Sequence, residues 1–352
     1  MWLLNACSWE MKEFISHKQT PPYAILSHTW GDGEVSFRDW NTERWPVVQG
    51  KEGFRKIDYC CQQAASDGLE WVWIDTCCID KSSSAELSEA INSMFRWYSS
   101  ATICYAYLYD VPQLSQLAEI ESAIRTSYWV TRGWTLQELI APCNVVFYSN
   151  DWHALGTRSE LSASLASITR IDEAYLTGRN LEQASIAQRM SWAARRTTSR
   201  EEDQAYCLLG IFNVHMPLIY GEGPRAFRRL QEILVLEYPE DHTLFAWGKV
   251  VPRLSNQVVD SEQIWGSKPI RYDPEQVDRK FFGLFAESPR DFEQSGELVC
   301  APFLTSYFRF GRKVPGPLTL VGKGIRADFS VYYSAGRWQY AVFHLKNPPI
   351  GE

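Results

Sequence analysis

Two side chains that can do chemistry together, the indole of Trp134 and the carboxylate of Glu138, lie within the stretch Arg132-Gly-Trp-Thr-Leu-Gln-Glu-Leu-Ile-Ala-Pro142. This stretch predicts a short helix, because apolar residues recur at helical spacing and Pro142 ends the run. Residues one turn apart on a helix share a face, so the ring and the carboxylate lie side by side. A carboxylate can act as a general base or stabilise positive charge on a substrate. It is more commonly a surface group on an amphipathic helix, so the chemistry of Glu138 depends on where the fold places it.

Four short apolar segments around this helix predict buried strands, and the stretches between them predict helices. The strands are expected at residues 23–27, 71–75, 101–108 and 145–148, and the helices at about 53–67, from the Ser83–Glu86 capping pair onward, and at 132–142. Regular alternation of strand and helix is typical of a parallel sheet with helices on both faces. We therefore predict an α/β fold with a parallel sheet in residues 1–150.

The polar segments that leave these strands are expected to meet at one edge of the sheet. In parallel sheets, ligands bind outside the carboxyl ends of the strands, near the point where strand order reverses. The loop at 27–32 follows the first strand, the loop at 75–81 follows the second, and the segment that leads to Glu138 follows the third. This convergence predicts a site around Glu138, and its other candidate residues are Ser27, His28, Trp30, Asp75, Arg132 and Trp134.

Ser27 and His28 are not expected to form a nucleophile–base pair, because neighbouring residues on a strand point to opposite faces. Ser27 is expected to face a ligand at the strand end, and His28 is either a ligand contact or a hydrogen-bond partner of Asp75. The segment at 31–33, Gly-Asp-Gly, is not a G-x-G-x-x-G fingerprint, and the sequence contains no P-loop. Classical dinucleotide-dependent redox chemistry and kinase chemistry therefore lack support.

The composition is that of an ordinary globular protein and limits its partners. The 352 residues carry a net charge of -7 and no basic run, which argues against binding to a nucleic-acid backbone. No apolar stretch approaches the ~20 residues of a membrane-spanning helix, and no signal peptide is recognisable. Nine cysteines, an odd number, suit a reducing compartment, so we expect a cytoplasmic location.

Adjacent cysteine pairs at 60–61 and 77–78 are candidates for a metal site, but they lack the C-x-x-C spacing of a metal knuckle. One pair falls in a predicted helix and the other follows a predicted strand. We therefore interpret all four as core thiols and expect no metal.

The residue pattern changes after residue 150. From 151 to 242, periodic apolar residues predict a helical extension that packs on the sheet. From 243 to 352, short segments between Gly and Pro turns, among them 282–286, 329–333 and 340–345, predict strands of a β-rich C-terminal part, which is either small or continues in a longer protein. Within the extension, the mixed-charge connector at 195–203 and the Tyr-Gly-Glu-Gly segment at 220–223 are candidates for holding an anion. A self-neutralising surface and a helix cap are their commoner roles.

Three motifs, in order along the chain, resemble fungal heterokaryon-incompatibility (HET) domains. They are Tyr-Ala-Ile-Leu-Ser-His-Thr-Trp-Gly at 23–31, Trp-Ile-Asp-Thr-Cys-Cys-Ile-Asp-Lys at 73–81 and Arg-Gly-Trp-Thr-Leu-Gln-Glu-Leu at 132–139. Segments at 196–212 and 220–223 resemble the continuation common in these proteins. The resemblance implies a cytosolic fungal protein of non-self recognition and regulated cell death, which acts with an incompatibility partner protein or through self-association.

HET domains are in turn similar to Toll/interleukin-1 receptor (TIR) domains, whose pattern of Trp followed four residues later by Glu-Leu matches Trp134, Glu138 and Leu139. That similarity implies a flavodoxin/TIR-like sheet and an NAD⁺ glycohydrolase in which Glu138 is the catalytic carboxylate. NAD⁺ is then the substrate, and no cofactor is needed. Nicotinamide is already a cationic leaving group, so one carboxylate beside an oxocarbenium-like ribose suffices. The connector between Leu108 and Ser127 is longer than in a minimal TIR domain.

The same similarity assigns the other candidates to the substrate. Trp30 or Trp134 would stack on a base, Arg132 would pair with the diphosphate, and Ser27 and Asp75 would line the ribose or phosphate side. Two alternatives stay open. One is a non-catalytic signalling or oligomerisation module of the same fold that triggers cell death through partners, and the other is an enzyme for a related nucleotide. The sequence also leaves open whether the product is linear or cyclic ADP-ribose.

Overall fold

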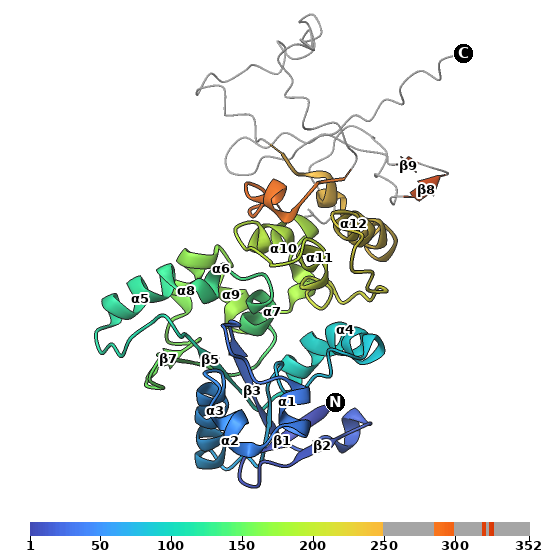
Figure 1. The fold of residues 1–352 in the computed structure, drawn as a ribbon. Helices are drawn as coiled ribbons and strands as arrows, with labels where there is room; N and C mark the ends of the chain where they lie inside the picture. The colour runs from blue at the N-terminus through green and yellow to red at the C-terminus, as the bar shows by residue number, and fades with distance from the viewer. Residues whose placement is uncertain (249–284, 299–318, 322–323, 327–352) are drawn as a thin grey trace, which may run out of the picture.

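A mixed seven-stranded β-sheet forms the first part of the chain (Figure 1). The computed structural model describes residues 1–248, 285–298, 319–321 and 324–326. The strands of this sheet lie in the order β2-β1-β4-β3-β5-β6-β7. Their bounds are β1 Trp2–Asn5, β2 Met11–Glu13, β3 Tyr23–His28, β4 Trp71–Trp73, β5 Ile103–Tyr107, β6 Val145–Tyr148 and β7 Ala154–Thr157.

The four central strands are parallel, and their order fixes where a ligand site can form. β4, β3, β5 and β6 pair with one another in parallel. Across the sheet, these four strands lie in the order second, first, third, fourth when they are numbered along the chain. The strand order therefore reverses between β3 and β5. At such a reversal, the connections leave in opposite directions and open a crevice at the carboxyl ends of the strands. β3 and β5 therefore flank the place where a ligand site is expected.

The prediction of a purely parallel sheet is wrong at both edges. β1 pairs antiparallel with β2 and β4, and β7 pairs antiparallel with β6. A few residues join β6 to β7, among them Trp152 with a φ of 65°. A connection this short can join only antiparallel strands, because parallel strands need a crossover of about a dozen residues or more. β7 also continues the sheet beyond residue 150, where only helices were predicted.

Helices cover both faces of the sheet, as predicted. Neighbouring residues of β5 point to opposite faces. The Tyr105 hydroxyl donates to Asp67 at the end of one helix, α3, at 2.6 Å, whereas the Cys104 thiol lies 4.0 Å from the Glu138 carbonyl of another, α7. These two helices therefore lie on opposite sides of the sheet. Figure 1 shows α7 and α4, which pack against each other, between the sheet and the helices of the extension.

The helices expected around the site are present, and the connector after β5 adds two more that the sequence did not predict, α5 and α6. The α-helices of the described residues are α1 Phe37–Thr42, α2 Trp45–Gln49, α3 Phe54–Ser66, α4 Ser84–Ser100, α5 Leu117–Thr126, α6 Tyr128–Thr131, α7 Thr135–Ile140, α8 Ser162–Thr169, α9 Glu173–Leu176, α10 Ile186–Ala193, α11 Asp203–Tyr206 and α12 Arg225–Glu237. Short 3₁₀ helices are η1 His17–Gln19, η2 Leu181–Gln183, η3 His242–Phe245 and η5 Pro289–Phe292.

The β-rich C-terminal part that the sequence predicts falls largely outside the described residues. Two short strands, β8 Thr319–Val321 and β9 Gly324–Arg326, form an antiparallel pair. The described residues at 242–245 and 289–292 are 3₁₀ helices. The strands predicted at 329–333 and 340–345, and most of the one at 282–286, lie outside the described residues.

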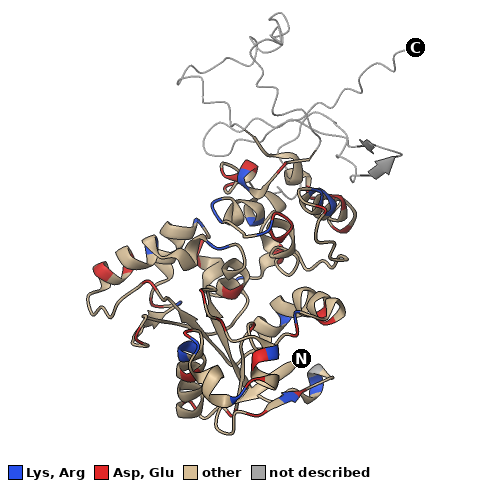
Figure 2. Cartoon of the chain, in the orientation of Figure 1, with Lys and Arg blue, Asp and Glu red and all other residues tan. Residues whose placement is uncertain are grey.

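Charged and apolar residues are distributed as in an ordinary globular fold. Figure 2 shows acidic and basic residues interspersed over the described elements.

The adjacent cysteine pairs are confirmed as core thiols, since Cys60, Cys61 and Cys77 are fully buried and Cys78 is 2% exposed. Among the described residues, no helix combines the length and the apolar character needed to cross a membrane.

Candidate active site

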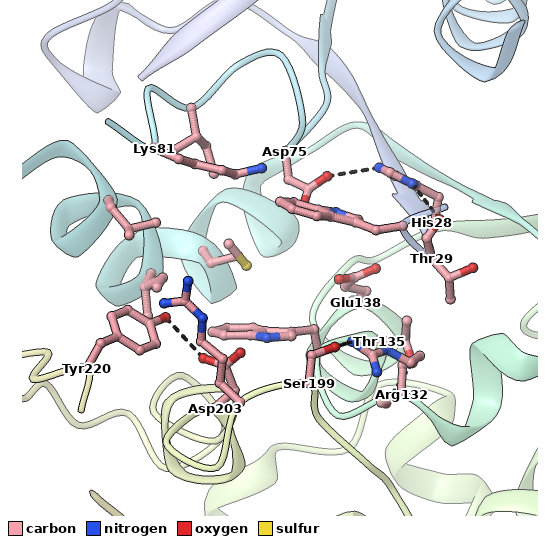
Figure 3. A pocket seen from close by; sticks show the side chains of 17 residues that line it. His28, Thr29, Asp75, Lys81, Arg132, Thr135, Glu138, Ser199, Asp203 and Tyr220 are labelled. Atoms are coloured by element: carbon pink, nitrogen blue, oxygen red, sulfur yellow. Dashed lines mark hydrogen bonds and ion pairs between the residues drawn. The ribbon is translucent and has the colours of Figure 1, made fainter. Parts of the chain in front are cut away.

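A cavity of about 300 Å³ opens between the carboxyl edge of the sheet and the helical extension. Its lining comes from the loops after β3 and β4, from α4, from α7 with the turn before it, and from the segment at 199–220. Figure 3 shows Asp75 and Lys81 on one side of the cavity, Asp203 and Tyr220 on the other, and Glu138 between them. This volume lies at the lower end of the range for small-molecule sites, which is enough to enclose part of a nucleotide.

Glu138 is the most deeply buried carboxylate of the cavity. The residue is 6% exposed, and its Oε2 accepts a hydrogen bond from the Ser27 hydroxyl at 2.5 Å. Ser27 in turn accepts one from the indole N–H of Trp129 at 2.8 Å. Burial raises the pKa of Glu138 to about 8, and the charge of Asp75 adds to the rise. Hydrogen bonds with Ser27 and Tyr98 and the charge of Arg196 oppose it. Glu138 is therefore mostly protonated at neutral pH when the cavity is empty.

Two arginines of the helical extension hold α7, which carries Glu138. Arg158 donates from Nη1 to the Leu139 carbonyl at 2.6 Å and so satisfies an acceptor at the end of the helix. Arg196 donates from Nη1 to the Arg132 carbonyl and to the Thr135 hydroxyl, each at 2.9 Å, at the start of the helix. A helix of 6 residues is not stable alone, so these contacts decide where the carboxyl group lies.

Asp75 is the central carboxylate of the cavity wall that the loops after β3 and β4 form. This carboxylate accepts hydrogen bonds from Nε2 of His28 at 2.9 Å and from the indole N–H of Trp30 at 2.8 Å. Burial acts to raise the pKa of Asp75, but the charges of Lys81 and His28 and these hydrogen bonds outweigh it and hold the pKa well below its usual range. The ammonium of Lys81 lies 3.5 Å from the centre of the Trp30 ring. The interpretation of His28 as a partner of Asp75 is thus confirmed, and His28 also lines the cavity.

The opposite wall, from α7 and the extension, has a similar arrangement around Asp203. This carboxylate accepts hydrogen bonds from the Tyr220 hydroxyl at 3.0 Å and from the side chain of Trp134. Burial raises the pKa of Asp203, and both hydrogen bonds oppose the rise. The guanidinium of Arg200 lies 4.4 Å from the centre of the Tyr220 ring. Each wall therefore presents an indole whose N–H is fixed by a carboxylate, and the two indoles can hold the flat faces of a ligand.

The structure brings most of the predicted site residues together. Those that line the cavity are His28, Trp30, Asp75, Arg132, Trp134 and Glu138. Ser27 does not line it, and the expectation that Ser27 faces a ligand needs correction. Ser27 is fully buried, and its hydroxyl is already engaged by Glu138 and Trp129. Its place is behind the carboxylate, where it fixes the position and the protonation of Glu138.

Sequence reasoning missed the lining residues that the extension and the loop after β4 supply. They are Ile79, Lys81, Ser199, Arg200, Asp203 and Tyr220. The segments at 195–203 and 220–223 do carry a signal, because both are candidates for holding an anion. What the sequence does not show is that these segments fold back onto the edge of the sheet.

Comparisons with known proteins agree with the motifs. Residues 23–120 match the family model of the Heterokaryon incompatibility protein (HET), and residues 225–332 match a domain of unknown function, DUF8212. The chain is also 49% identical over 219 residues to the Vegetative incompatibility protein HET-E-1 of Podospora anserina. That alignment takes in 60% of this chain and 16% of the length of the relative. No solved structure matches the chain. The HET match takes in the first two of the three motifs, and the alignment with HET-E-1 is a similarity to part of that protein.

Proposed function

We propose that this chain is an effector of fungal non-self recognition and regulated cell death, and that it acts by cleaving NAD⁺ with release of nicotinamide. The incompatibility role is supported by the HET family match and by the similarity to HET-E-1. The observation that carries the chemistry is the position of Glu138. It is a buried carboxyl group, held by Ser27, at a cavity that two indoles also line.

NAD⁺ cleavage needs little beyond one well-placed carboxylate. The bond between the ribose carbon and nicotinamide breaks, and its electrons go to the ring, which is cationic in NAD⁺ and leaves neutral. No general acid is therefore required, unlike in ordinary glycoside hydrolysis. The ribose carbon becomes oxocarbenium-like, and the carboxylate of Glu138 stabilises the charge that develops there. Attack by water gives ADP-ribose, and attack by the adenine ring gives the cyclic form.

The raised pKa of Glu138 is compatible with a positively charged substrate. A carboxyl group with a pKa of about 8 is mostly neutral near pH 7. A pyridinium cation in the cavity favours the ionised form, because an opposite charge a few ångströms away lowers the pKa of a carboxyl group. The carboxylate thus becomes available when the substrate that requires it is bound.

The strand order supports the TIR-like part of this proposal. Second-first-third-fourth is the order of the parallel strands in flavodoxin-like sheets. The helix with Trp134 and Glu138 follows β5, the third of these strands, which is where the similarity to TIR domains requires the catalytic carboxylate.

Nicotinamide release from NAD⁺ by the full chain tests the proposed activity. We expect nicotinamide and ADP-ribose, linear or cyclic, to accumulate, as measured by liquid chromatography. The assay should span a wide range of protein concentration and include chemically cross-linked oligomers, so that a need for self-association does not hide turnover. No turnover under any of these conditions overturns the proposal and leaves the non-catalytic signalling module.

The activity is expected to rise with pH as Glu138 ionises. Since kcat/KM reports the ionisation of the free enzyme, it should increase about tenfold per pH unit below the pKa and level off above it. That pKa is about 8. Ser27→Ala removes a hydrogen bond that favours the carboxylate, so its profile should move to higher pH. A kcat/KM for NAD⁺ that stays flat between about pH 6 and pH 9 contradicts this role of Glu138.

A further inference from the structure

The carboxylates that line the cavity are already engaged by protein donors. Asp75 and Asp203 each accept hydrogen bonds from two side chains, and Glu138 is hydrogen-bonded to Ser27 and Tyr98. With a pKa of about 8, Glu138 adds little negative charge near pH 7. Protein donors therefore already occupy part of the acceptor capacity of each carboxylate.

Two arginines of the cavity, by contrast, keep donors that no group of the described residues uses. Among residues 1–248, Arg132 donates to two neutral hydroxyls, that of Tyr128 at 3.3 Å and that of Ser199 at 2.9 Å. Arg200 contacts the face of the Tyr220 ring. Within the described part of the chain, neither arginine is in a salt bridge. A guanidinium carries five N–H donors in a fork whose geometry matches the oxygens of a phosphate.

The backbone brings these two arginines to the same wall. Arg132 and Thr197 form a parallel bridge, and the N–H of Gly133 donates to the Thr197 carbonyl at 2.8 Å. The two segments lie so close that a Cβ at Gly133 would be 2.6 Å from the side chain of Thr198. Ser199, which Arg132 contacts, directly precedes Arg200. Figure 3 shows Arg132 and Ser199 joined beside Glu138.

The third cation of the cavity, Lys81, is differently placed. Its ammonium lies over the Trp30 ring, and its charge helps to hold the pKa of Asp75 low. Lys81 therefore offsets the negative charge of its own wall. On the opposite wall the charge of Arg200 likewise acts to lower the pKa of Asp203, but Arg132 adds a second cation to that wall.

From these contacts we infer that Arg132, Ser199 and Arg200 form a phosphate-binding subsite, which takes the diphosphate of a dinucleotide while the indoles of Trp30 and Trp134 hold a base. The subsite rests on the proposed function for the identity of that dinucleotide. In this subsite, Ser199 and Arg200 come from the helical extension, outside residues 23–120, the segment that matches the HET model. The helical extension is then part of the active site and not only a cover for the sheet.

Binding of ADP-ribose to the full chain tests this subsite. Glu138→Gln serves as the parent, so that no turnover interferes, and affinity is measured by calorimetry. We expect Arg132→Gln and Arg200→Gln each to weaken binding about tenfold, because each removes a charge-assisted contact to phosphate. Inorganic pyrophosphate should displace ADP-ribose from the parent. Arg228→Gln on α12, where the arginine side chain is 69% exposed, removes the same charge away from the cavity and should change nothing.

Several results would overturn the subsite. They are an unchanged affinity in both cavity variants, no ADP-ribose binding by the parent, and a loss of affinity that accompanies a lower unfolding temperature. The outcome is separable from that of the proposed reaction. Arginine-dependent binding without NAD⁺ cleavage by the wild-type chain keeps the subsite and removes the reaction. Cleavage of NAD⁺ with an unchanged KM in both arginine variants keeps the reaction and removes the subsite.

Discussion

Glu138→Gln is expected to lower the rate of nicotinamide release by at least about a hundredfold, the size of effect seen when a group that stabilises transition-state charge is removed. Gln has nearly the same shape as Glu, and its carbonyl oxygen can still accept the hydrogen bond that the Ser27 hydroxyl donates at 2.5 Å. It cannot carry the negative charge that the oxocarbenium-like ribose requires. The rate is measured by chromatography with saturating NAD⁺, so that a change in KM does not mask it.

The same substitution is expected to increase stability at alkaline pH. Because the pKa of Glu138 is raised from 4.5 to about 8, the folded chain retains a proton that the unfolded chain loses across this range. The contribution of Glu138 to stability therefore falls as pH rises through this window. Gln does not ionise, so the unfolding temperature of Glu138→Gln should exceed that of the wild type above about pH 8, by a few degrees or more. Thermal unfolding followed by circular dichroism across this pH range measures the difference.

Activity and stability together separate catalysis from a structural role. Glu237→Gln, at an exposed position of α12, makes the same chemical change far from the cavity and should alter neither quantity. A Glu138→Gln chain that unfolds more easily at every pH supports a structural carboxyl group. A folded variant that cleaves NAD⁺ at the wild-type rate refutes the catalytic assignment. A folded variant that no longer kills fungal cells favours the enzyme over the signalling module.

The centre of the sheet could be predicted because its strands are buried on both faces. Each of the 6 residues of β3 is buried, so the strand reads as a short apolar run with turn residues at its ends. Once four such strands are recognised, the rule that parallel strands end at one edge brings Trp30, Asp75 and Glu138 together. That step requires no knowledge of side-chain contacts, which is why it succeeded.

The rest of the site depends on contacts that leave no local pattern in the sequence. Ser27 and Glu138 are 111 residues apart, and only the packing of α7 on β3 turns Ser27 from a ligand contact into a support for the carboxyl group. Asp203 and Tyr220 reach the cavity because the extension folds back on the turn before α7, where Gly133 leaves room for Thr198. The edge strands β2 and β7 have 3 and 4 residues and are partly exposed, so they lack the continuous apolar run that marks the buried strands.

Gly210→Ala is expected to destabilise the chain by about 3 kcal/mol or more, the upper range for inserting a carbon into a packed contact. A Cβ at this position would lie 2.0 Å from Cβ and 2.5 Å from Cγ of Phe95, so α4 and the segment after α11 would have to move apart. α4 lines the cavity through Met94, and α11 lines it through Asp203. Nicotinamide release should therefore fall together with the unfolding temperature, and the two are measured on the same preparation.

Phe95→Gly shows whether the loss comes from this contact. With both the ring and the Cβ of Phe95 removed, the added methyl group of Gly210→Ala has room, so Gly210→Ala should cost less than about 1 kcal/mol in the Phe95→Gly chain. Gly31→Ala is the control, because the nearest atom to a Cβ there is the Glu34 Oε1 at 4.0 Å. If Gly210→Ala costs the same in the wild-type chain and in the Phe95→Gly chain, the two residues are not coupled. The approach of α4 to the extension would then not be what sets the width of the cavity.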